Sequence, residues 1–211
     1  MDTESRTRAT LAFLHVDAHL LVIDKLSGLH SVPAKPPGEQ DCVEARLRAV
    51  FPGALLVHRL DRDTSGVIVF ARTRLAQRHL NWQFERRQMA KSYVARVSGS
   101  VAGESGRIDL PLACDWPNRP LQLVTPLGKA AVTDWLVIGR EPGATRLRLR
   151  PLTGRSHQLR VHMLAHGHPI LGDPFYGEPA SADRLQLHAE TLGFRHPDGG
   201  APVTFRAETP F

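Results

Sequence analysis

The stretch of this 211-residue chain best suited to chemistry is the nonapeptide HRLDRDTSG at positions 58–66, in which Asp61 lies between two arginines. Short apolar runs flank it, at positions 55–57 and 67–70, and both predict strands. The charged segment is then a connection between two buried strands, a common place for functional side chains. We therefore expect Asp61 to be the reactive group, as a nucleophile or as a proton acceptor. The alternative is an ordinary polar turn, in which the DTSG residues supply only turn chemistry.

Three short motifs resemble those of one enzyme family. The HRLD run at 58–61 is similar to the motif that carries the catalytic aspartate in the RluA family of pseudouridine synthases, which implies that role for Asp61. The KSY run at 91–93 resembles the family's K-x-Y motif, and implies that Tyr93 stacks on the target base. In the TGRSHQLR run at 153–160, Arg155 matches the arginine that pairs with the catalytic aspartate, and Leu159 matches the apolar residue that lines the pocket.

The resemblance also implies how this site meets its substrate. The target atoms of a stacked strand are hidden, so the nucleotide must be flipped out, at a cost of roughly a few kcal/mol. Arg59, beside Asp61, is expected to fill the vacated space. His58 and Thr64, on either side of Asp61, are expected to contact the substrate.

The implied reaction needs no metal, cofactor or ATP. The uracil is detached at its bond from C1′ to N1, turned within the pocket, and rejoined through C5. Asp61 either attacks C1′ or removes a proton from C2′, and the sequence leaves both possibilities open. An ionised carboxylate in a site closed by RNA is costly unless it is paired, which gives a physical reason for Arg155.

The family likeness covers residues 15–207 in matching order, and implies an α+β fold. The expected architecture is a long, mostly antiparallel, mixed sheet with flanking helices and a central active-site cleft. The CDWPNRP run at 114–120 is similar to the short members of the family, which lack an N-terminal S4 RNA-binding module. We therefore expect a single catalytic domain over residues 1–211.

Local patterns predict the elements that position these motifs. Apolar alternation and turn signals favour strands at 19–24, 91–97, 130–138, 146–151, 185–189 and 203–205. Helices are expected from about residue 41 to 50, over 74–88, and after Ser156, which is expected to cap the third helix before Gly167 ends it. Prolines predict a loop at 31–38 and a turn-rich insertion at 109–120.

The composition and charge of the chain limit the kinds of partner it is expected to bind. A net charge of +6 and a pI near 10.0 favour a polyanion such as RNA, although the 27 basic residues could also reflect coding bias. Arg146, Arg148 and Arg150 alternate with apolar residues, which predicts a basic strand face. No apolar run is long enough for a membrane span, so we expect a cytoplasmic protein. Two distant cysteines suggest neither a disulfide framework nor a zinc site.

Other chemistries are less favoured by the sequence. His162 and His166 have the spacing of a metal pair, but they lack the glutamate of HExxH. No GxSxG, GxGxxG or Walker motif indicates a hydrolase or a nucleotide cofactor. A glycosidase would usually need a second carboxylate. An RNA-binding module without activity remains the main alternative, but it would not need Asp61, Tyr93 and Arg155 together.

The expected substrates are therefore RNA loops. The nearest resembling proteins act on both a 23S rRNA hairpin and the anticodon stem-loop of certain tRNAs, and we expect the same of this chain. No obligatory protein partner is expected, and a monomer is the default.

Overall fold

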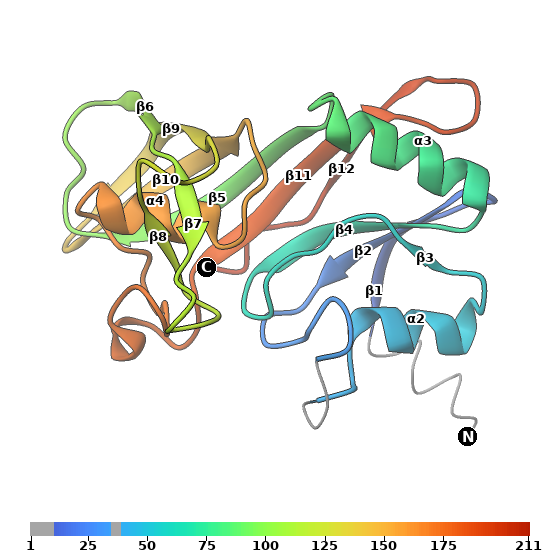
Figure 1. Ribbon diagram of the computed structural model, residues 1–211, viewed down its shortest axis with the longest axis horizontal. Coiled ribbons are helices and arrows are strands. Elements are labelled where there is room, and N and C mark those ends of the chain that lie inside the picture. Colours follow the sequence, from blue (N-terminus) through green and yellow to red (C-terminus); the bar gives the residue numbers. More distant parts are fainter. Residues whose placement is uncertain (1–10, 35–38) are drawn as a thin grey trace. The chain divides into compact units, whose positions relative to one another are not determined.

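The computed structural model describes residues 11–34 and 39–211 (Figure 1). Residues 35–38, at the end of the predicted 31–38 loop, lie outside the described part. The chain divides into two compact units, residues 1–91 with 189–210 and residues 92–188 with Phe211. The strands β5 (Ala90–Ser98) and β11 (Leu187–Arg195) contribute residues to both units.

The first unit is built on strands in the order β1-β2-β4-β11, with β3 on β4 and β12 on β11. The pairs β1–β2, β2–β4, β3–β4 and β11–β12 are antiparallel. The central strand β4 is buried along its whole length, because its residues are apolar or small. The bounds are β1 (Ala12–Val16), β2 (Leu20–Lys25), β3 (Leu55–Leu56), β4 (Ser65–Ala71) and β12 (Pro202–Arg206).

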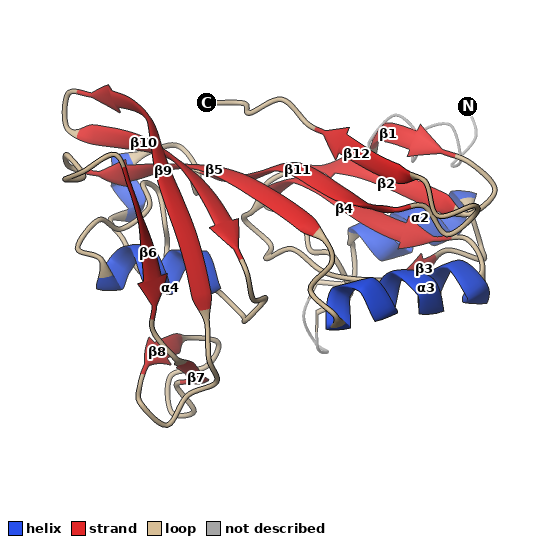
Figure 2. Ribbon diagram, turned by 90° about the horizontal axis from the view of Figure 1, so that it is seen from above, coloured by secondary structure: helices blue, strands red, loops and turns tan. Residues whose placement is uncertain are grey.

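Two helices belong to this unit. In α2 (Val43–Val50), the cysteine at position 42 is the cap, and its sulfur accepts from the amide of Ala45. In α3 (Arg74–Glu85), Thr73 is the cap, and the buried Ala76 and Leu80 face the core. Figure 2 shows α3 alongside β4, against which it packs. The helix ends three residues earlier than predicted, before Arg87 takes a positive φ of 56°.

The second unit has strands in the order β5-β10-β9-β6, all antiparallel where they pair. Leu147 and Leu149 of β10 are fully buried, together with Met163 of the helix α4 (Gln158–Ala165). The bounds of the other strands are β6 (Ser105–Asp109), β9 (Val132–Glu141) and β10 (Ala144–Pro151). A short 3-10 helix, η1, spans Pro179–Ser181.

The predicted insertion at 109–120 is only partly irregular. Its residues Leu112–Cys114 form β7, which pairs with β8 (Gln122–Val124) in a separate two-stranded sheet. Pro117 and Pro120 lie in the connection between these strands and Pro111 lies just before β7, where no ladder hydrogen bond is required. We call β7, β8 and the residues between them the β7–β8 hairpin.

The predicted cap of the third helix is wrong. His157, not Ser156, occupies the cap position, with a left-handed φ of 51° and no side-chain capping bond. The side-chain oxygen of Gln158 instead accepts from the amide of Arg155 and from the hydroxyl of Thr153. A glutamine inside the first turn therefore organises the segment that a serine was expected to organise.

The predicted fold class is confirmed as α+β with a mostly antiparallel sheet. The predicted strands are confirmed, most of them with small shifts at their ends. The exception is β11, which spans Leu187–Arg195 and so ends six residues beyond the predicted 185–189. Within the described ranges, no helix has the length and apolar character needed to cross a membrane. The basic face of β10 is also present, but Arg146 is engaged with Glu141 and with the carbonyl of Phe211.

Candidate functional site

The HRLD loop lies between β3 and β4, and a buried lysine supports it. Lys25 is only 1% exposed, and its ammonium donates to the carbonyl oxygens of Leu26, Leu29 and Arg62 at 2.7–2.8 Å. A buried ammonium requires such acceptors, since it has lost its water. The bond to Arg62 ties the end of β2 to the residue that follows Asp61.

Two serines hold the same loop from the same side. Ser27 donates its hydroxyl to the carbonyl of Asp63 at 2.6 Å. Ser31 donates to the carbonyl of Leu60 at 2.7 Å and accepts from the amide of Leu60 at 3.1 Å. The backbone on both sides of Asp61 is therefore fixed by side chains from residues 25–31, which the sequence did not predict as part of the site.

The glycine that ends the motif is required by two independent constraints. Gly66 has φ +109°, which residues with a side chain rarely adopt. A Cβ at this position would also lie 2.2 Å from the carbonyl oxygen of Ala189. The glycine thus allows the loop to enter β4 while the backbone of β11 passes close by.

The histidine of the motif is part of this support. The Nε2 atom of His58 accepts from the amide of Val69 at 3.1 Å, and its ring stacks on Phe84 with centroids 4.8 Å apart. Burial, with a smaller contribution from the positive charge of Lys91, lowers the pKa of His58 to about 3. The imidazole is therefore neutral at physiological pH. This geometry favours a role of His58 in positioning the loop. The substrate contact that we predicted for it stays a prediction.

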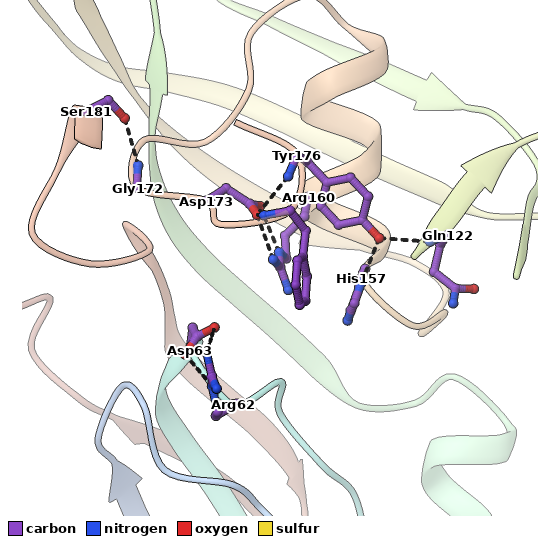
Figure 3. A network of polar contacts seen from close by, with 10 residues as sticks. Arg62, Asp63, Gln122, His157, Arg160, Gly172, Asp173, Tyr176 and Ser181 are labelled. Carbon is purple, nitrogen blue, oxygen red and sulfur yellow. Dashed lines mark hydrogen bonds and ion pairs between the residues drawn. The ribbon is translucent and has the colours of Figure 1, made fainter. Parts of the chain in front are cut away.

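The remaining residues of the motif differ in exposure. Asp61 is half-buried, and its carbonyl accepts from the amide of the buried Thr64 at 3.2 Å, which closes a turn. Arg59 is exposed, as an RNA contact would require. Arg62 and Asp63 form an ion pair at 2.9 Å (Figure 3). The turn thus carries the predicted reactive carboxylate on a fixed backbone.

The other predicted site residues lie in the second unit. Tyr93 is partly buried and packs against the core that also contains Leu159. Arg155 is half-buried, and its Nε donates to the carbonyl of Ala130 at 3.1 Å. The predicted site residues thus fall into two groups, with the HRLD loop in the first unit and Tyr93, Arg155 and Leu159 in the second. The pairing of Asp61 with Arg155 stays a prediction.

A buried ion pair fixes the end of the Arg155 motif, and sequence reasoning missed it. Arg160 and Asp173 are 2% and 0% exposed, and two nitrogens of the guanidinium bond the two carboxylate oxygens at 2.8 and 2.6 Å. Asp173 also accepts from the amides of Phe175 and Tyr176. The sequence did not predict this pair, because Asp173 lies 13 residues beyond Arg160 and in a different segment.

A tyrosine hydroxyl links two segments of the same unit. The hydroxyl of Tyr176 is hydrogen bonded to Nδ1 of His157 at 2.7 Å and accepts from the amide of Gln122 at 2.9 Å (Figure 3). This joins the start of α4 to β8. The contact was not predicted, because nothing in the local sequence connects these positions.

Of the two histidines considered as zinc ligands, His162 is held by hydrogen bonds within the protein. His162 is fully buried, with Nδ1 2.9 Å from the hydroxyl of Thr133 and Nε2 3.0 Å from the carbonyl of Leu110. Burial lowers the pKa of His162, consistent with a neutral ring in this network. Both ring nitrogens have protein partners, so the structure does not support His162 as a metal ligand.

Comparisons with known proteins place these features in context. The family model described as RNA pseudouridylate synthase matches residues 19–165. A "dual-specificity RNA pseudouridine synthase RluA" from Yersinia pestis is 54% identical over 203 residues, covering 94% of this chain and 98% of the relative. A protein of the same name from Escherichia coli K12 is 51% identical over 206 residues, covering 95% and 94%.

Solved structures agree with the sequence comparisons. Human "RNA pseudouridylate synthase domain containing 1" superposes with a TM-score of 0.80 at 28% identity, over 95% of this chain and 84% of that one. Human "RNA pseudouridylate synthase domain containing 4" also gives 0.80, at 24% identity and over 98% and 92%, which shows the fold alone.

Proposed function

Because the chain belongs to the RNA pseudouridylate synthase family, and is therefore an isomerase, we propose that it modifies uridines in two RNAs, a hairpin loop of 23S rRNA and the anticodon stem-loop of tRNAs. The observation that carries this proposal is the near full-length similarity to relatives whose name includes "dual-specificity". We further propose that it acts as a monomer in the cytoplasm, where both RNAs are found.

The reaction follows from a balance of bonds. The bond from C1′ to N1 breaks and a bond from C1′ to C5 forms, while C5 loses a proton and N1 gains one. The product is an isomer, so side chains able to attack, hold and transfer protons are the groups required. In the proposed mechanism, Asp61 either attacks C1′ or removes the C2′ proton.

The fixed loop supports the assignment of Asp61. The carbonyls of the residues before and after it, Leu60 and Arg62, accept from Ser31 and Lys25. A reactive carboxylate gains rate when its approach to the substrate is set in advance. We propose that Arg59 fills the space left by the flipped nucleotide, with His58 and Thr64 near the substrate, and that Tyr93 stacks on the uracil above the pocket wall at Leu159.

Arg155→Ala tests the proposed charge pair. If Arg155 stabilises ionised Asp61, its loss removes most activity and makes the carboxyl harder to ionise, because an opposite charge nearby favours the charged form. The profile of the single-turnover rate against pH should then move its acidic limb to higher pH. A variant with an unchanged rate and an unchanged profile would show that the two side chains do not act together.

The function itself is tested by mapping pseudouridine in rRNA and tRNA from cells with and without the gene. Loss of one position in 23S rRNA and one in the anticodon arm of tRNAs, with recovery on re-expression, is the expected result. Loss at only one class of RNA would reduce the proposal to single specificity. Unchanged maps would favour the alternative of a binding module without activity.

A further inference from the structure

The tip of the β7–β8 hairpin exposes an aromatic ring together with a cation. Trp116 is 68% exposed, and the guanidinium of Arg119 lies over its ring, 4.5 Å from the centroid. Arg119 is exposed as well. Large exposed aromatic side chains are unusual on protein surfaces without a partner, and burying this ring would be favourable.

Hydrogen bonds within the tip hold this pair in a defined loop. The amide of Asp115 donates to the carbonyl of Leu121 at 2.9 Å, and the amide of Leu121 donates to the carbonyl of Asn118 at 3.0 Å. The side-chain amide of Asn118 donates to the carboxylate of Asp115 at 3.0 Å. A ring presented by such a loop loses less conformational freedom on binding than one on a flexible segment.

The hairpin is also bonded to the segment that carries Arg155. Tyr176 joins the amide of Gln122 to the ring of His157, two residues after Arg155. In the segment that follows β8, the carbonyl of Ala130 accepts from Arg155 itself. Both contacts therefore connect the β8 side of the hairpin to the segment of a proposed catalytic residue, all within the second unit.

We propose that Trp116 and Arg119 form a platform on which an unpaired base of the substrate RNA stacks, a recognition element outside the catalytic set. The inference rests on the proposed function for its choice of RNA. Exposed aromatic rings and guanidinium planes are the groups on which proteins stack splayed bases of RNA loops. The net charge of +6 favours a polyanionic partner such as RNA.

The test compares Trp116→Ala, Trp116→Phe and Arg119→Ala with the wild-type chain. The probes are synthetic stem-loops with the tRNA anticodon-arm and 23S hairpin sequences, and the readouts are Kd and the single-turnover rate at saturating enzyme. Leu127→Ala is the matched control, because Leu127 is 96% exposed in the turn that follows β8. Its apolar side chain has neither a ring nor a charge to offer to a base.

Stacking of one base predicts a 5- to 150-fold rise in Kd, as an order-of-magnitude range, for Trp116→Ala, with most affinity kept in Trp116→Phe and no change in Leu127→Ala. Arg119→Ala should also raise Kd, because it removes the guanidinium plane of the platform. The saturated rate should stay within about twofold, because the platform does not touch the reacting atoms.

If Trp116→Ala binds both stem-loops with a Kd within about twofold of the wild-type value, the platform is overturned. The platform would also be overturned if sedimentation showed a dimer for the wild-type chain but not for Trp116→Ala, while the RNA affinity stayed unchanged. The ring would then serve self-association. The proposed function fails separately, if the wild-type chain forms no pseudouridine in either stem-loop. The platform is tested by the change in Kd, so it can be judged whether or not the wild-type chain forms pseudouridine.

Discussion

Histidine 58 illustrates how the environment of one residue decides its role. Its Nε2 accepts the Val69 amide, so the ring must be neutral to keep that bond. Burial beside Lys91 lowers its pKa to about 3, which preserves the neutral form. His58, which the sequence predicts only as a substrate contact, thus accepts a hydrogen bond that supports the loop before Asp61.

The lowered pKa of His58 predicts a pH dependence of stability. In the unfolded chain the imidazole binds a proton as pH falls below 6.5, whereas in the folded chain it does so only near pH 3. The wild-type free energy of unfolding should therefore fall as pH is lowered through this window. In His58→Gln, whose side chain cannot titrate, the free energy of unfolding should fall less steeply with pH. Urea unfolding followed by circular dichroism at several pH values measures this.

His196 gives a control of opposite sign. Burial alone would lower its pKa, but hydrogen bonds to Asp198 and to the carboxylate of Asp17 outweigh this and raise it. Its contribution is present below the unfolded pKa and is lost as pH rises through the folded pKa. Relative to wild type, His196→Gln should lose stability as pH falls while His58→Gln gains. The same trend in both variants would contradict the assignment.

At the scale of elements, the two motif segments are held by different means. Hydrogen bonds from Lys25 and two serines fix the HRLD loop, whereas an ion pair between Arg160 and Asp173 fixes the start of α4. The guanidinium of Arg160 also lies 5.1 Å from the ring centres of Phe175 and Tyr176. Removing either partner would leave a buried charge without its counterion.

Arg160→Met should therefore lower the free energy of unfolding by about 3–5 kcal/mol, because Asp173 stays buried. Arg107→Met is the matched control in the same unit: Arg107 also pairs with an aspartate through two bonds, to Asp134, but it is exposed. Its loss should cost less than about 1 kcal/mol. Equal losses in the two variants, measured by denaturant unfolding, would argue against a structural role specific to the buried pair.

Local patterns in the sequence predicted most elements, because continuous apolar runs in β2 and β4 and apolar alternation in β5 and β10 match their burial. The loop at the centre of the site was also predicted, because strand signals surround it. What could not be predicted is how side chains distant in sequence meet. Examples are the lysine of β2 that supports the HRLD loop and the ion pair of Arg160. The predicted cap at Ser156 was wrong because the helix begins after His157, which has a left-handed φ and makes no side-chain capping bond.

For the whole molecule, surplus positive charge is the property most relevant to RNA. The outer side of α3 carries exposed arginines, and Arg86 lies over the ring of the exposed Trp82 at 5.4 Å. Exposed cations contribute to RNA affinity mainly by releasing counterions from phosphates. On β10, by contrast, Arg146 already has protein partners and is less suited to such a role.

This charge predicts a steep effect of salt on binding. The Kd for either stem-loop should rise as salt is increased, and Arg78→Ala on α3 should lower the slope of log Kd against log salt by about 1. Arg107→Gln serves as the comparison, since that guanidinium is bound to Asp134. Filter binding at several salt concentrations measures both. Salt-independent binding would contradict an electrostatic contribution.

The central claim is that Asp61 carries the isomerisation of uridine in two different RNA loops. Its most direct test is to incubate the tRNA and 23S rRNA stem-loops with the wild-type chain and with Asp61→Asn, and to measure pseudouridine and RNA affinity together. We predict pseudouridine in both loops with wild type and none with Asp61→Asn. The Kd of the variant should stay within a few-fold, because one carboxylate oxygen changes and the arginines remain. Formation of pseudouridine by Asp61→Asn at near wild-type rate would contradict the claim.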